Sequence, residues 1–215
     1  MSDFHQNGII TTFHNFRTKQ LDHIERELEK FSEKRPMQLI LPSLFSELSG
    51  SALPDIVNKL KEVKYLKQIT IGLDNADEKQ FLYAKEFFSV LPQEVKILWH
   101  DGPRMKAVSN LLKESGLDKS FPGKGRNVWY CMGYVYGQKN CEAVALHDCD
   151  ILTYDREMLA RLFYPIANPA YNFYFCKGYY SRIADGKMNG RVGRLLVPPF
   201  VKALKKVSHN NSRFL

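Results

Sequence analysis

Two carboxylates separated by one residue, Asp148 and Asp150, are the part of the sequence best suited to chemistry. They follow a short apolar run, residues 143–146, which predicts a strand buried on both faces. In open α/β sheets, ligands lie outside the carboxyl ends of the strands. Mg²⁺ is commonly bound by one or two carboxylates together with substrate phosphates. The pair is therefore interpreted as a site for a metal–diphosphate, which indicates a nucleotide.

An Asp-x-Asp pattern also occurs by chance, so its interpretation depends on the elements that position it. Apolar runs predict strands at 37–42, 68–73, 95–99 and 143–146. Amphipathic spacing and capping residues predict helices at 13–34, 78–89, 104–114 and 127–136, with Asp77 as an N-cap, and one that starts at Ser51 or Pro54 and ends at Lys64. Strands that alternate with helices favour a parallel sheet with right-handed crossovers.

The chain after Asp150 has a different pattern. A helix is predicted at 154–162, with Asp155 near its start, and another at 200–207. Residues 171–180 alternate aromatic with small or polar side chains, as an antiparallel strand does. Asp185-Gly186 and Asn189-Gly190 are turn signals.

Composition restricts the class of protein. A chain of 215 residues with 44% hydrophobic residues can form one domain, or one and a half. The net charge of +8 suits an anionic partner, either a nucleic acid or a phosphorylated metabolite or sugar nucleotide, but equally a merely basic surface. No dense Lys/Arg block or nucleic-acid motif is present. The four cysteines lack CxxC spacing, and no signal or membrane segment is evident, so we expect a soluble cytoplasmic protein with reduced thiols.

Several motifs occur in one order along residues 37–215. They are Pro-x-x-x-x-Glu at 42–47, Asp74-Asn75-Ala76-Asp77, Gly123-Lys124-Gly125, Asp148-Cys149-Asp150, and Lys177-Gly178-Tyr179-Tyr180 followed by Gly190-Arg191-Val192. With them the sequence resembles the nucleotide-sugar transferases of the GT-A fold, especially the glucosyl-3-phosphoglycerate synthase group and its mannosyl relatives. This resemblance implies a Rossmann-like α/β fold with a mostly parallel central sheet flanked by helices, and a small antiparallel segment near the acceptor side. We expect a leader and helix at 1–36, a nucleotide-sugar-binding half at 37–153 and an acceptor-side half at 154–215.

The resemblance also implies roles for individual residues. The donor-binding residues would be Pro42, Ser43, Leu44 and Glu47 around the uracil and ribose, Asp74 near the base, Lys124 at the diphosphate or sugar, Asp148 at hydroxyls, and Asp150 as the ligand of Mg²⁺ or Mn²⁺. Gly190 and Arg191 would bind the acceptor's phosphate or carboxylate, and Lys177 is either an acceptor contact or a strand-end charge. Two positions depart from the family: Ser46 replaces its usual Asn, and Gly193 replaces its usual Thr. His147 is interpreted as a packed histidine rather than a metal ligand.

The resemblance leads to three hypotheses about function. The first is a metal-dependent, retaining hexosyltransferase that uses UDP-glucose, or else GDP-mannose, and a small acidic acceptor such as 3-phosphoglycerate or glycerate. The second is an incomplete or non-catalytic nucleotide-binding fragment, because the family continues beyond this point to a carboxylate near the sugar and a metal-binding His. The third is a nucleotidyltransferase, although residues 42–47 lack the glycine and basic residue expected there. A homodimer is possible under any of these, and no nucleic-acid or membrane partner is expected.

Overall fold

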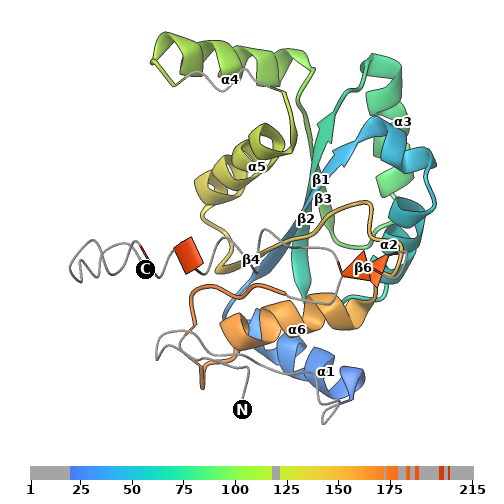
Figure 1. The fold of residues 1–215 in the computed structure, drawn as a ribbon, viewed down its shortest axis with the longest axis vertical. Helices are drawn as coiled ribbons and strands as arrows, with labels where there is room; N and C mark the ends of the chain where they lie inside the picture. Colours follow the sequence, from blue (N-terminus) through green and yellow to red (C-terminus); the bar gives the residue numbers. More distant parts are fainter. Residues whose placement is uncertain are drawn as a thin grey trace. The chain divides into compact units, whose positions relative to one another are not determined.

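A parallel sheet is the centre of the structure, a computed structural model that describes residues 20–117, 122–171, 173–178, 183–184, 187–188, 199–200 and 203. The chain divides into two units, Met1–Cys176 and Lys177–Leu215. Among the described residues, the sheet of the first unit has the order β3-β2-β1-β4, and every neighbouring pair is parallel (Figure 1). Its strands are β1 (Met37–Leu44), β2 (Leu66–Asp74), β3 (Glu94–Trp99) and β4 (Ala143–Leu146). This confirms the predicted α/β class.

Helices cover both faces of this sheet. The helices of the first unit are α1 (Leu21–Ser32), the 3₁₀ helix η1 (Phe45–Ser49), α2 (Ala52–Leu60), α3 (Glu78–Phe88), α4 (Pro103–Glu114), α5 (Lys124–Gln138) and α6 (Arg156–Ala167). Of these, α4 has no buried residue and lies away from the strands (Figure 1). Alternate residues of β1 point to opposite faces. Leu39 and Leu41 join the large core that includes α1, α2, α3 and α6, whereas Ile40 packs with Cys131 and Val135 of α5. Figure 1 accordingly shows α5 on the opposite side of the strands from α2 and α3.

The strand order reverses between β1 and β4. The chain places β2 and β3 successively on one side of β1, and then returns to add β4 on the other side. In open α/β sheets, such a reversal opens a crevice at the carboxyl ends of the two strands involved. Asp148 and Asp150 follow β4 directly, so the topology puts the predicted diphosphate site at this switch point.

The prediction that residues 143–146 form a strand buried on both faces was wrong. Ala143 and Ala145 are buried, but Val144 and Leu146 are 37% and 38% exposed. Among the described residues, β4 pairs only with β1, so it is an edge strand of the sheet. Because all four residues are apolar, the sequence did not indicate that their side chains alternate between buried and exposed.

The first strand continues beyond its predicted end. Ser43 and Leu44, which follow the predicted strand 37–42, belong to β1 and lie opposite Leu73 and Asp74 of β2. The carbonyl of Ile40 accepts a hydrogen bond from the His147 amide, where the pairing with β4 ends. The backbone N–H groups of residues 40 and 42 point towards the same neighbouring strand. Because the pairing with β4 ends at Ile40, the missing N–H of Pro42 removes no hydrogen bond to β4.

Several helix boundaries also differ from the predictions. The helix expected to start at residue 127 starts at Lys124, after Gly123, whose φ of +136° favours glycine. The helix α1 begins at Leu21, after an extended Gln20, and residues 13–19 lie outside the described residues. The helix α2 ends at Leu60 rather than at residue 64, and α6 runs to Ala167 rather than to 162.

The second unit is described only in part. The strands β5 (Ile183–Ala184) and β6 (Lys187–Met188) pair antiparallel, which confirms a small antiparallel segment. The strand predicted at 171–180 is absent from its described part, residues 171 and 173–178. Most of the helix predicted at 200–207 lies outside the described residues.

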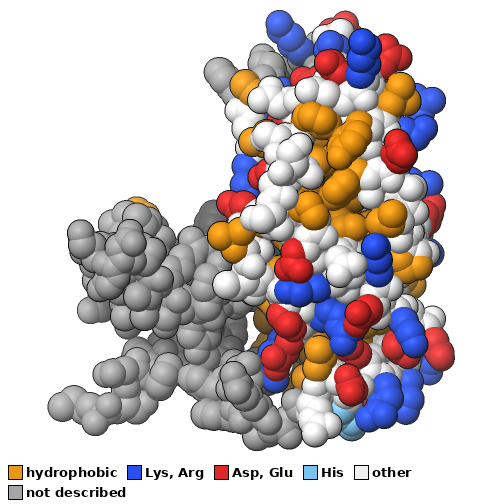
Figure 2. All heavy atoms as spheres, turned by 90° about the vertical axis from the view of Figure 1, so that its right-hand side faces the viewer, with side chains coloured by type: hydrophobic (Ala, Val, Ile, Leu, Met, Phe, Trp, Pro, Cys, Tyr) orange, Lys and Arg blue, Asp and Glu red, His pale blue; other side chains and the backbone are white. Residues whose placement is uncertain are grey.

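The side of the molecule that carries α2 and α3 is shown in Figure 2. Hydrophobic side chains gather there above a region where acidic and basic side chains alternate. Ion pairs among the described residues include Arg156 with Glu25, at 3.6 Å, and Arg156 with Glu62. Because the charges of both signs are interspersed, this side offers an anionic ligand no concentrated positive field.

None of the helices in the described part of the chain combines the length and the apolar character that crossing a membrane requires.

Candidate functional site

The two acids after β4 reach solvent while the residue between them is buried. Asp150 is exposed, the Asp148 side chain is 43% exposed, and Cys149 is 2% exposed within the core. Burial raises the pKa of the Cys149 thiol far above its ordinary range, so it stays protonated. The alternation explains the Asp-x-Asp spacing, because the central side chain anchors the turn and both carboxylates project outward.

A lysine from α5 reaches this turn. Lys124, the first residue of α5, forms an ion pair with Asp148, and both side chains are about half exposed. The two residues are 24 positions apart in the sequence, and both were predicted to contact the donor. The structure brings them together. The amino end of α5 also carries the positive end of the helix dipole, which favours a phosphate nearby.

The carboxyl end of β1 supplies the residues predicted around the base and ribose. Pro42 and Ser43 are buried, whereas Leu44 is 44% exposed. Glu47 is partly buried, and its Oε2 accepts a hydrogen bond of 3.0 Å from the Leu44 amide. One carboxylate oxygen of Glu47 thus caps η1. The other oxygen is available for the predicted contact with sugar hydroxyls.

Asp74, predicted near the base, has a partner that the sequence reasoning missed. Its Oδ1 accepts a hydrogen bond of 2.8 Å from Arg126, and the two side chains are only 10% and 18% exposed. The amide of Asn75 donates to the same oxygen at 3.2 Å. A buried carboxylate needs a counter-charge, and Arg126 supplies it here from 52 residues further along the chain.

Asn127 of α5 fixes this helix against β2. Its Nδ2 donates a hydrogen bond of 2.7 Å to the carbonyl of Gly72. A Cβ on Gly72 would lie 1.8 Å from Asn127 Oδ1 and 2.6 Å from Cys131 Sγ. The close approach of α5 to the sheet therefore depends on a glycine at position 72.

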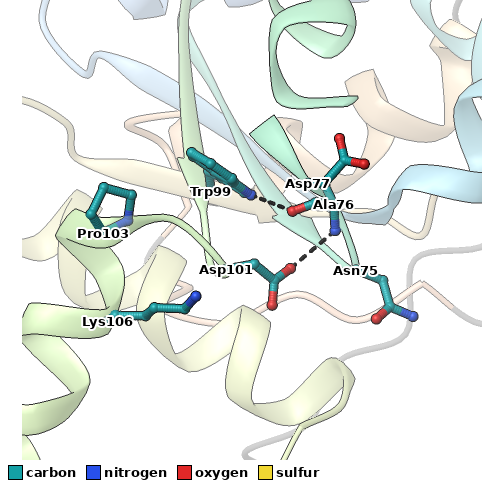
Figure 3. Close-up of a pocket in the computed structure, with 7 residues that line it drawn as sticks. All are labelled: Asn75, Ala76, Asp77, Trp99, Asp101, Pro103 and Lys106. Atoms are coloured by element: carbon teal, nitrogen blue, oxygen red, sulfur yellow. Dashed lines mark hydrogen bonds between the residues drawn. The ribbon is translucent and has the colours of Figure 1, made fainter. Parts of the chain in front are cut away.

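Side chains at the end of β3 and just after it make hydrogen bonds to the loop that follows Asp74 (Figure 3). Trp99 Nε1 donates to the carbonyl of Ala76 at 2.7 Å, and Asp101 Oδ2 accepts from the Ala76 amide at 3.0 Å. These residues line a pocket of about 570 Å³ together with Asn75, Asp77, Pro103 and Lys106. Asn75 has a φ of +60°, a left-handed conformation that asparagine tolerates. Both polar groups of Ala76 are satisfied, so the loop beside Asp74 has a defined conformation.

His147 is packed, as expected. It is 4% exposed, and its ring lies edge-to-face on Tyr154 with centroids 5.4 Å apart. Neither ring nitrogen has a hydrogen-bond partner in the described part of the chain. Burial lowers the pKa of His147 to about 4, against a smaller opposing effect of Asp148.

This burial predicts a pH dependence of stability. The pKa of His147 lies below its ordinary value of 6.5 in the folded state, so only the unfolded chain takes up this proton between about pH 6.5 and 4. Folding free energy is therefore lost as the pH falls through this range, by roughly 3 kcal/mol from this residue. Urea unfolding from pH 7.5 to 4 measures the loss, and His147→Phe should be less sensitive to acid by that amount. An identical pH profile for both proteins would contradict the burial of a neutral histidine.

The described residues contain no group of three or more His, Cys, Asp or Glu side chains placed to hold a metal. A divalent cation at Asp150 would then take its other ligands from diphosphate oxygens and water. Hard oxygen ligands of this kind fit Mg²⁺ or Mn²⁺. Of the predicted acceptor residues, Gly190 and Arg191 lie outside the described residues, and Lys177 is exposed in the second unit.

Lys124, Asp148 and Asp150 lie at the switch point of a parallel sheet, which is where open α/β proteins bind their ligands. Sequence comparisons narrow the class of protein further. The chain is 48% identical over all 215 residues to glucosyl-3-phosphoglycerate synthase of Persephonella marina. It is 37% identical over 210 residues to the enzyme of that name from Methanococcoides burtonii. It covers 53% and 51% of these proteins, so it spans about half the length of the curated relatives it matches. The resemblance to glucosyl-3-phosphoglycerate synthases is thus confirmed.

Other comparisons are less informative. No protein-family model matches the chain. Among solved structures, it is similar to glucosyl-3-phosphoglycerate synthase from Mycobacterium tuberculosis in complex with Mn²⁺, UDP and glucosyl-3-phosphoglycerate. That similarity has a TM-score of 0.47 and 16% identity, over 73% of this chain and 46% of the other.

Proposed function

We propose that this chain provides the donor site of a glycosyltransferase that transfers glucose from UDP-glucose to 3-phosphoglycerate. The observation that carries the proposal is the 48% identity across the whole chain to a protein named for that product. The arrangement of Lys124, Asp148 and Asp150 at the switch point supports it, because a diphosphate needs positive charge and a metal ligand at one place.

Each residue of the site has a role in this proposal. Asp150 holds Mg²⁺ or Mn²⁺, which would supply positive charge to the leaving diphosphate. Lys124 binds the same diphosphate, and on donor binding its ammonium exchanges part of its contact with Asp148 for phosphate oxygens. Asp148 then accepts hydrogen bonds from sugar or ribose hydroxyls, and Asp74 lies towards the base. The exposed end of β1 at Leu44 and the partly buried Glu47 border the nucleoside.

The acceptor side remains a prediction. We propose that Gly190, Arg191 and Lys177 bind the phosphate or carboxylate of 3-phosphoglycerate, since the planar guanidinium of arginine suits both groups. Transfer with retention of configuration, cytoplasmic location and a homodimer are likewise predictions, as are the boundaries of the donor half at 37–153 and the acceptor half at 154–215.

A transfer assay tests the proposal. The purified chain is incubated with UDP-glucose, 3-phosphoglycerate and Mn²⁺, and the product is identified by mass and by the anomeric coupling in its NMR spectrum. We expect glucosyl-3-phosphoglycerate with the α configuration of the donor, less product with GDP-mannose or glycerate, and none without metal. Release of diphosphate from UTP and glucose 1-phosphate instead would indicate a nucleotidyltransferase and contradict the proposal.

A second candidate is a nucleotide-binding module without turnover. It is suggested by the length of the chain relative to its curated relatives. The chain covers only about half of its curated relatives, so groups needed for transfer can lie in the other half. Metal-dependent UDP binding without any product would favour this candidate.

A further inference from the structure

The first turn of α5 makes ion pairs on two sides. Lys124 contacts Asp148, which follows β4, and Arg126 contacts Asp74 at the end of β2. Residues two apart in an α-helix are separated by roughly 200° around the axis, so their side chains leave on nearly opposite sides. Because β1 lies between β2 and β4 in the sheet, this turn spans the carboxyl end of β1 at the switch point.

The two ion pairs differ in how firmly they are held. The side chains of Arg126 and Asp74 are 18% and 10% exposed, whereas those of Lys124 and Asp148 are 58% and 43% exposed. An exposed lysine pair exchanges readily with solvent and contributes little to stability. A mostly buried arginine–carboxylate pair is costly to break, because each charge would remain buried without its partner. The Arg126 side is therefore the fixed end of the turn.

Arg126 depends on Asp74 for its position. The hydrogen bond that its guanidinium makes to the described residues goes to Asp74 Oδ1, and its buried Nε has no partner among them. Next to it, Asn127 is bonded to Gly72, also in β2. The start of α5 is thus tied to β2 by two consecutive residues, while the exposed side chain of Lys124 pairs with Asp148 on the other side of β1.

We propose that Arg126 is a positioning residue: its bond to Asp74 fixes the first turn of α5 above the end of β1 and thereby sets where Lys124 meets the donor diphosphate. Only the last step rests on the proposed function. The placement of Lys124 itself can be tested without a ligand.

The ligand-free test uses NMR of the chain after reductive methylation of its lysines with ¹³C-formaldehyde. The signal of Lys124 is assigned by its loss in Lys124→Arg. We expect Arg126→Met to shift this signal towards that of a fully exposed lysine, and Arg161→Met to leave it unchanged. Arg161 is a matched control, because its ion pair with Glu157 lies within α6. Should Arg126→Met fail to fold, as judged by circular dichroism, Asp74→Asn tests the same link; an unmoved Lys124 signal in the folded variant would overturn the inference.

The ligand-dependent test is a double-mutant cycle on UDP binding with Mn²⁺, measured by calorimetry. We expect Arg126→Met to weaken binding about tenfold, Arg126→Lys to restore part of it, and Arg126→Met to add no further loss in a Lys124→Met background. Additive losses would show that Arg126 acts independently of Lys124 and would overturn the inference. If the unmodified chain binds no UDP, the proposed function fails, and the NMR result still decides the role of Arg126.

Discussion

Asp150→Ala is expected to abolish the metal-dependent part of nucleotide binding. Asp150 is the exposed acid of the Asp-x-Asp turn, and Asp148 already has a cationic partner in Lys124. The described residues hold no alternative group of three or more metal-binding side chains, so the cation would lose its protein anchor. Calorimetry with UDP should then give the same affinity with and without Mn²⁺, and at least about a hundredfold weaker binding than the unmodified chain with Mn²⁺.

Glu94→Gln is the matched control for this variant. Glu94 begins β3, at the opposite edge of the sheet, and forms a surface ion pair of 2.7 Å with Lys96. The Glu94→Gln substitution removes one carboxylate and leaves the switch point intact, so the affinity for UDP with Mn²⁺ should not change. Unaltered affinity in Asp150→Ala would mean that the cation is held elsewhere.

Gly72→Ala is expected to cost more stability than other single-methyl additions in the sheet. The added Cβ would lie 1.8 Å from Asn127 Oδ1 and 2.6 Å from Cys131 Sγ, distances at which atoms overlap. Relief requires the Asn127 side chain to rotate or α5 to move away from β2, and either change breaks the bond from Asn127 to the Gly72 carbonyl. We expect a loss of about 3 kcal/mol in unfolding free energy, at the upper end for overpacking, measured by urea denaturation.

Gly133→Ala provides the comparison within α5. A Cβ at Gly133 would meet nothing within 4 Å, and alanine favours the helix interior. This variant should gain roughly 0.5–1 kcal/mol. Equal stabilities of Gly72→Ala and the unmodified chain would contradict the close packing of α5 on β2 and, with it, the position of Lys124.

The strand and helix order was predictable because apolar runs and capping residues are local signals. Asp77 shows this, since it caps α3 by accepting from the Gln80 amide, as expected from its place before an amphipathic run. The exposure of Val144 and Leu146 was not predictable in this way, because it depends on how far a helix covers that face of the sheet at its edge strand. The extension of β1 to Leu44 likewise depends on its pairing with the end of β2.

The candidate site was predictable at the residues that a motif marks. Lys124 and Asp148 were identified from glycine spacing and an Asp-x-Asp pattern, and the structure brings them together. Arg126 was missed because its role arises from a buried partner 52 residues away, which no local pattern reveals. The bond from Glu47 back to Leu44 was missed for a related reason, since the extent of β1 determines where η1 begins.

The central claim is that the carboxyl edge of β1 and β4 binds a metal–nucleoside diphosphate. Calorimetry of the purified chain with UDP and with GDP, each with and without Mn²⁺, tests it most directly. We predict that UDP binds with Mn²⁺ at one site per chain, and that its affinity falls strongly when the metal is removed or when GDP replaces UDP. Absence of binding by either nucleotide in the presence of Mn²⁺, with the chain folded, would contradict the claim.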